Sequence, residues 1–299
     1  MKYIYLFLFA VLLVSCKDDI DSELILNKGK EKLVVYAFPS TNDSIFIDVC
    51  IGKVKNGETN KPVIKSIECL VNGKKDKIIY KEDSDENGIY KTCFCAVGKH
   101  TSGDTIMINV SAEGVLSVSG STVIPQMAKS EYVNMDTISY KGDTYNRILL
   151  NIHDNKSIEY YAACIVAAVD NDNDQEKYET VELEVDNEPL LKKYTSTKFN
   201  FETSNSFYGN MYIFDSETFR NSSALLHLYV MQQPWYNAFN TKIYSLSKEY
   251  FNMLRSLNNS KNNDFGKYGM AFTYSTYSNV ENGYGCIAAY NVTESGWIK

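Results

Sequence analysis

Histidine and basic charge are both scarce in this 299-residue sequence, and their scarcity excludes several classes of function. The three histidines, His100, His153 and His227, lie far apart and outside any motif, so we expect neither a histidine-based catalytic centre nor a metal site. Thirty lysines and arginines stand against 37 acidic residues, which gives a net charge of −7. Because no positive excess exists to neutralise phosphates, we expect no nucleic-acid partner.

Sequence motifs of catalysis are also missing. The chain shows no serine–histidine–aspartate arrangement, no glycine-rich phosphate loop and no HExxH pair. We therefore predict a protein that is not an enzyme and that needs no cofactor. Acidic residues are plentiful, and a surface hydrolase that uses two carboxylates stays open as an alternative, because sequence spacing cannot show two side chains meeting across a cleft.

One acidic segment, 170–176, partly resembles a calcium-binding loop in its sequence. Asp170, Asp172 and Asp174 alternate along it, but an EF-hand loop that began at Asp170 would need glycine at its sixth position and glutamate at its twelfth. The chain has Gln175 and Val181 there. We predict a solvated hairpin tip, with a looser calcium site as the alternative.

The seven cysteines do not form a metal or redox motif. No pair has CxxC spacing, which argues against a zinc ribbon or a thioredoxin-like site. Cys93 and Cys95 are two residues apart in an expected strand, so their side chains would share one face. An exported chain can form disulfides, but spacing gives no connectivity, and we favour buried free thiols.

The first sixteen residues predict a lipoprotein signal. Met1 and Lys2 precede an uncharged apolar run over 3–14, which is too short to span a bilayer as a helix. Residues 13–16, Leu-Val-Ser-Cys, resemble the bacterial lipobox, so we expect a signal peptide over 1–15 and lipid on Cys16. Acyl chains on that cysteine would anchor the mature protein to a membrane.

The residues after Cys16 suggest where the anchored protein faces. Lys17, Asp18 and Asp19 are similar to the lysine-plus-acids signal that sends lipoproteins of Bacteroidetes across the outer membrane to the cell surface. An acidic tether on a protein that faces the periplasm would look much the same. We expect a flexible tether over 16–30 and exposure at the cell surface.

The remainder of the chain predicts a mainly β protein in two parts. Short β-type runs separated by Asn-Gly and other glycine turns predict an immunoglobulin-like sandwich over 31–125, closed at Pro125. Its expected strands are 33–38, 44–49, 66–71, 77–80, 88–96, 104–112 and 116–124. A second antiparallel β-rich domain follows over 126–299, with expected strands at 145–152, 160–169, 178–185, 198–203, 211–214, 224–231 and 285–291.

One short helix is expected in the second domain, over 247–257. Ser247 is a suitable N-cap, and Leu246 can pack onto Phe251 across the first turn. Tyr250, Leu254 and Leu257 form an apolar stripe at spacings of four and three, which favours packing over a sheet. Two asparagines at 258 and 259 should end the helix.

Aromatic residues are concentrated late in the chain and give the best candidate binding site. Gln232 to Phe239 reads as a loop after a strand, and we predict that Trp235, Tyr236 and Phe239 there stack on sugar rings or hold peptide side chains. The alternative is that these rings pack against the helix or the other domain.

The segment 279–285, Asn-Val-Glu-Asn-Gly-Tyr-Gly, favours a structural role. Asn282 and Gly283 are typical of a turn with positive φ, and Gly285 would allow close backbone approach at the start of the last strand. We expect Glu281 to cap backbone N–H groups in that turn. A loop that contacts ligand is the alternative.

Two C-terminal segments carry a resemblance to a known family. The residues YSLSKEYF at 244–251, YSNVENGYG at 277–285 and AAY at 288–290 resemble the helix start and the ending of the Bacteroidetes lipoprotein family called domain of unknown function 4249. Val280 stands where the family has isoleucine, and Cys-Ile-Ala at 286–288 replaces its usual Ile-Phe-Gly. The early strand at 31–35, Tyr90 and residues 123–125 also fit, so the resemblance spans 16–299.

The resemblance implies a function without supplying catalytic residues. Genes of that family often lie beside TonB-dependent receptors, so we expect a lipid-anchored outer-membrane surface protein that serves TonB-dependent nutrient uptake as a non-enzymatic accessory subunit. Its implied partners are the outer membrane, a TonB-dependent receptor and the lipoprotein associated with that receptor. The alternative is a surface protein that binds oligosaccharide or peptide directly.

Overall fold

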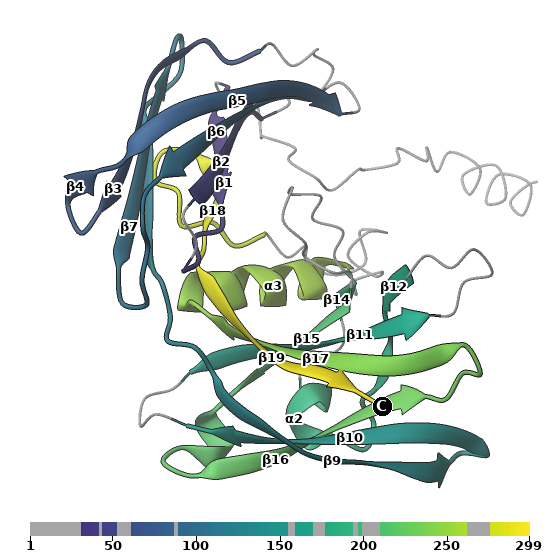
Figure 1. Ribbon diagram of the computed structural model, residues 1–299. Helices are drawn as coiled ribbons and strands as arrows, with labels where there is room; N and C mark the ends of the chain where they lie inside the picture. The colour runs from purple at the N-terminus through teal and green to yellow at the C-terminus, as the bar shows by residue number, and fades with distance from the viewer. Residues whose placement is uncertain are drawn as a thin grey trace, which may run out of the picture.

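The computed structural model describes residues 31–41, 44–52, 61–86, 89–154, 159–169, 177–193, 197–198, 210–261 and 276–299. Two β-sandwiches lie one above the other in these ranges, with a helix between them (Figure 1). Four sheets built mostly of antiparallel pairs confirm the prediction of a mainly β fold. Within the described ranges, no helix is both long and apolar enough to cross a membrane.

The first sandwich joins a five-stranded sheet, here called sheet A, to a four-stranded sheet B. In spatial order, sheet A contains β18 (Tyr284–Ile287), β1 (Leu33–Ala37), β2 (Ser44–Ile51), β6 (Ile89–Val97) and β5 (Lys77–Glu86). Sheet B contains β4 (Lys74–Lys75), β3 (Ile64–Val71), β7 (Thr105–Ala112) and β8 (Val118–Val123). Alternation explains the packing, since every second residue of β2 is buried: Ile45, Ile47, Val49 and Ile51.

The second sandwich joins sheet C to sheet D. Sheet C contains β13 (Leu183–Glu184), β16 (Ser223–Met231), β10 (Asp143–His153) and β9 (Lys129–Tyr140). Sheet D contains β14 (Thr197–Lys198), β15 (Asn210–Asp215), β11 (Tyr160–Val169), β17 (Tyr236–Leu246) and β19 (Tyr290–Ile298), and β12 (Lys177–Thr180) pairs with the far end of β11. Two short helical pieces complete it, α2 (Pro189–Lys192) and the 3-10 turn η1 (Glu217–Phe219).

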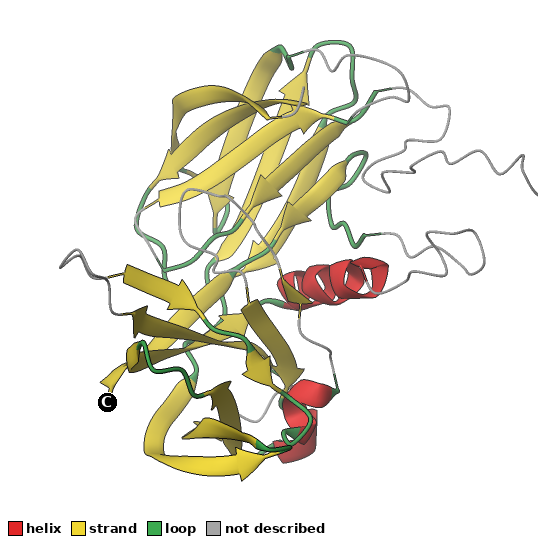
Figure 2. Cartoon of the chain, turned by 90° about the vertical axis from the view of Figure 1, so that its right-hand side faces the viewer, coloured by secondary structure: helices red, strands yellow, loops and turns green. Residues whose placement is uncertain are grey.

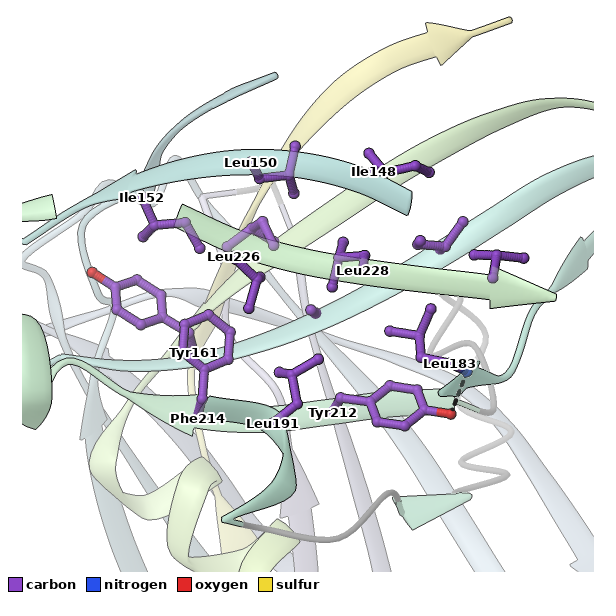
Figure 3. Packing of buried hydrophobic residues seen from close by; sticks show 14 of the residues in the cluster. Ile148, Leu150, Ile152, Tyr161, Leu183, Leu191, Tyr212, Phe214, Leu226 and Leu228 are labelled. Atoms are coloured by element: carbon purple, nitrogen blue, oxygen red, sulfur yellow. Dashed lines mark hydrogen bonds between the residues drawn. The ribbon is translucent and has the colours of Figure 1, made fainter. Parts of the chain in front are cut away.

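Aliphatic residues of sheet C face aromatic residues of sheet D in the core of the second sandwich (Figure 3). Leu226 and Leu228 of β16 lie across from Tyr161, Tyr212 and Phe214. The buried Tyr212 hydroxyl accepts a hydrogen bond from the Leu183 backbone N–H at 2.8 Å, so this large ring is buried without losing its polar contact.

A third hydrophobic core joins the two sandwiches through helix α3 (Lys248–Lys261), which lies between them (Figures 1 and 2). Phe251 and Leu254 of α3 are buried against the outer face of sheet D, and Cys286 of β18 belongs to the same cluster. Ser247 caps the helix as predicted, because its hydroxyl oxygen accepts the Tyr250 N–H at 3.3 Å. The helix continues to Lys261, beyond the asparagines that we expected to end it.

The C-terminal chain contributes to both sandwiches. The expected single strand at 285–291 is two strands, and β18 pairs in parallel with β1, with Val34 opposite Tyr284 and Ala37 opposite Ile287. The chain changes sheets at Ala289, whose N–H donates to the Ser247 hydroxyl at 3.1 Å. Part of the expected second domain, 126–299, therefore completes a sheet of the first sandwich.

A buried asparagine, Asn291, forms hydrogen bonds across the junction of the two sandwiches. Its Oδ1 accepts from the Thr41 N–H at 3.1 Å and from the Thr41 hydroxyl at 2.8 Å. Its Nδ2 donates to the Ser102 hydroxyl at 3.1 Å and to the Pro125 carbonyl at 2.6 Å. Only 1% of Asn291 is exposed, and its four hydrogen bonds connect β19 to three segments outside the second sandwich, at Thr41, Ser102 and Pro125.

Candidate functional site

The predicted aromatic site divides between surface and core. Residues from Tyr236 onward belong to β17 and not to a loop, since Tyr236 pairs with Val169 and Phe239 pairs with Ala167 of β11. Phe239 is 3% exposed and lies in the core of the second sandwich, which corrects the expectation that it contacts a ligand. Trp235 precedes the strand and is 45% exposed.

Tyr236 connects the exposed tryptophan to the core. Its ring meets Trp235 edge-on at 6.1 Å between centroids and Phe239 at 5.8 Å. Burial and a hydrogen bond to Glu179 raise the pKa of Tyr236 to about 12, so the phenol stays protonated and donates to that carboxylate. Tyr236 therefore holds the start of β17 to β12 and leaves Trp235 as the accessible member of the predicted trio.

A second exposed aromatic pair was missed by the sequence interpretation. The rings of Tyr178 on β12 and Trp297 on β19 stack with 5.2 Å between centroids and 24° between planes. Both side chains stay about half exposed, at 48% and 47%. The position of each ring near a strand end could have suggested that it is exposed. Nothing in the sequence, however, shows that two non-adjacent strands bring the rings together.

Several predicted features lie outside the described residues. These are the lipidation site Cys16, the export signal Lys17, Asp18 and Asp19, and the acidic segment 170–176. They remain predictions from the sequence. Among the residues that the structure does describe, no group of three or more histidine, cysteine, aspartate or glutamate side chains is placed to hold a metal ion.

Two partly buried carboxylate–histidine pairs, one in each sandwich, stabilise the fold. Glu188 is the N-cap of α2, and its carboxylate accepts from the Leu190 N–H at 3.0 Å. The same carboxylate accepts from the His227 N–H at 2.8 Å and lies 3.1 Å from the His227 Nδ1. His100 pairs with Asp76 at 2.8 Å. These contacts connect neighbouring segments. Because each of these polar side chains has a hydrogen-bond partner within the protein, no ligand is needed to explain its position.

The six cysteines of the described chain are free thiols, as favoured from the sequence, and all but Cys50 are buried. Burial raises the pKa of Cys69 and of Cys164 to about 12. Burial and the nearby Asp48 carboxylate raise the pKa of Cys50 to about 11. A thiol with such a pKa carries almost no thiolate at neutral pH, so these side chains are packing residues and poor nucleophiles.

The segment 279–285 has the structural role that we favoured. Asn282 has a φ of 60°, which confirms the positive-φ turn at that residue, and Gly285, where we expected close backbone approach, has a φ of 107°. The Asn279 side chain accepts from the Ile287 N–H at 2.9 Å and donates to the carbonyls of Ile287 and Ser121. Glu281 differs from the expectation of a cap, because its carboxylate accepts from the Ser119 hydroxyl at 3.5 Å.

Two glycines of this segment permit close contact between the chain around β18 and the neighbouring strand β1. A Cβ on Gly283 would lie 2.6 Å from the Leu33 carbonyl oxygen, and one on Gly285 would lie 2.0 Å from that of Val35. Both distances are far below van der Waals contact, so only glycine lets β18 lie against β1 at this depth.

Comparison with known proteins places the chain in a family without supplying an activity. No curated protein matches the sequence. A family model matches residues 17–295, a range that includes both sandwiches, helix α3 and the 279–285 segment. The chain belongs to the family described as Domain of unknown function (DUF4249).

Proposed function

We propose that this protein is a lipid-anchored surface protein of the outer membrane and a non-enzymatic accessory subunit of TonB-dependent nutrient uptake. Lipid on Cys16 would hold it to the membrane, and Lys17, Asp18 and Asp19 would direct it outward. Leu33, where β1 begins, follows Cys16 by 17 residues. That stretch spans at most about 60 Å when fully extended, so the first sandwich would stay close to the membrane.

The observation that carries this proposal is the third core around α3. It combines side chains of sheet D, α3 and β18 into one buried cluster, so the two sandwiches keep a fixed relative geometry. A subunit that docks beside a receptor at a membrane loses less conformational entropy when its surfaces are already fixed in place.

A pull-down from native membranes tests the proposal. Full-length protein, extracted in mild detergent, should bring down a TonB-dependent receptor, and protease added to intact cells should digest it. The matched variant Cys16→Ser should leave the envelope fraction and lose the receptor. Recovery of the wild-type protein without any TonB-dependent receptor would contradict the uptake role, and retention of Cys16→Ser in the membrane would contradict the anchor.

The exposure of Trp235 favours a second candidate function, direct binding of oligosaccharide or peptide. An indole that is 45% exposed and supported by Tyr236 can stack on a ring without first being ordered. If it does, Trp235→Ala should weaken binding of cellohexaose or of a mixed hexapeptide pool by about tenfold, measured by calorimetry. Leu116→Ala removes another exposed apolar side chain and is the control. Equal affinities in wild type and Trp235→Ala would end this candidate.

A further inference from the structure

The outer face of sheet D is covered by α3 over only part of its area. At one end of the sheet, Ala162, Cys164, Tyr244 and Leu246 face outward and are buried in the cluster around the helix. Strand β12 pairs with the other end of β11, which Figure 1 shows lying beyond the helix. A different set of side chains covers the sheet there.

That set begins with the Tyr178–Trp297 stack. In the strand register, Tyr178 lies opposite Ala168, Ala168 lies opposite Ala238, and Trp297 lies opposite Asn240. All of these side chains are on the outer face, because the alternate residues Ala167 and Phe239 point into the core. The two alanines are small enough for the large rings to meet above them, and Ala238 is only 5% exposed beneath the rings.

Polar groups lie directly beside the stack. The Glu294 carboxylate accepts from the Asn240 Nδ2 at 2.9 Å and from the Lys242 Nζ at 3.0 Å. Burial raises the pKa of Glu294, but the hydrogen bonds from Asn240 and Lys242 outweigh it and hold that pKa below its ordinary value. The side chain is 43% exposed, so the ionised carboxylate has further lone pairs that can accept hydrogen bonds from a ligand.

Asn240 gives an independent sign that a hydrogen-bond donor belongs here. Its Nδ2 faces a carboxylate, which fixes the orientation of the amide. The Oδ1 atom is buried and accepts no hydrogen bond from any of the residues that the structure describes. A buried acceptor without a donor is unfavourable, and a hydroxyl that entered beside Trp297 would remove the cost.

We propose that Tyr178, Trp297, Asn240 and Glu294 form a binding site for a neutral pyranose ring of an oligosaccharide. A pyranose offers an apolar C–H face to the aromatic rings and hydroxyl donors to Glu294 and Asn240. The Glu294–Lys242 ion pair leaves no net charge at the site, which suits a neutral ligand better than an anion or a cation. The inference goes beyond the uptake role and uses none of the residues of the Trp235 candidate.

The two tryptophans of the chain allow a direct test. In a Trp235→Phe background, Trp297 is the only fluorophore of its kind, so its emission reports on this site alone. We would titrate full-length protein with cellohexaose, maltoheptaose and chitohexaose. At least one sugar should shift the emission with saturation, and Tyr178→Ala or Glu294→Gln should weaken that binding by about tenfold or more.

Controls separate a binding role from a structural one. Calorimetry on Trp297→Ala should show the binding lost and on Trp297→Phe partly kept, while circular dichroism should show both variants folded. Three outcomes would overturn the proposal: no emission shift with any of the three sugars, sugar affinity that survives Trp297→Ala, or sugar affinity lost only with Trp235→Ala. Because no receptor is present in this assay, its failure leaves the uptake role to be decided by the pull-down.

Discussion

Gly285→Ala should strongly destabilise the protein. The new Cβ would lie 2.0 Å from the Val35 carbonyl oxygen, and the backbone φ of 107° is unfavourable for any residue with a side chain. Left-handed strain costs about 1–2 kcal/mol and overpacking about 1–3 kcal/mol, so we expect a loss of roughly 2–5 kcal/mol in the free energy of unfolding. Urea denaturation of both proteins measures it.

Gly142→Ala is the matched control for that experiment. Gly142 has a φ of 92°, but an added Cβ there would meet no heavy atom within 4 Å. This variant should lose only the strain contribution, about 1–2 kcal/mol. Equal losses at the two positions would show that the contact between β18 and β1 is less tight than the structure indicates.

Phe251→Ala should have the second large effect, on both stability and the connection between the sandwiches. Phe251 is 2% exposed and its ring lies 4.7 Å from that of Tyr160, centroid to centroid. Removing a buried phenylalanine side chain costs about 3–5 kcal/mol. Since α3 occupies the junction, part of that cost should appear as separation of the two sandwiches.

Two measurements distinguish separation from general unfolding. Small-angle scattering of Phe251→Ala should show a larger radius of gyration at temperatures where circular dichroism still reports native β structure. Phe251→Leu keeps most of the apolar volume and should stay compact. A variant that unfolds in one step with an unchanged radius beforehand would argue against α3 as the connection.

Alternation of apolar residues decided which strands could be predicted. β11 was predicted with its observed bounds, and β2, β7 and β10 within one or two residues, because each has a clear apolar run or a clear buried face. β9 was missed because most of its residues are exposed, so it shows no apolar stripe. β17 was not predicted as a strand, and its first residues were assigned to a loop, because its two faces enter two different cores and hydrophobic residues follow one another.

Contacts between segments far apart in the sequence limited how much of the binding surfaces could be predicted. The turn at 279–285 was predictable because Asn-Gly chemistry acts locally. The Tyr178–Trp297 stack depends on strand order, with β11 and β17 lying between β12 and β19. Strand order is a property of the whole sheet, so local spacing could not reveal the pair. The same limit explains why the burial of Phe239, four residues after the exposed Trp235, was not predicted.

The pairing of β1 with β18 has a consequence for how the polypeptide acquires its fold during synthesis. β1 leaves the ribosome early, yet its parallel neighbour is made only after almost all of the intervening chain. Until then the free edge of β1 can pair with the wrong segment or with another nascent molecule. Closing so long a loop is slow, so the first sandwich should reach its final form late, after sheet C is already in place.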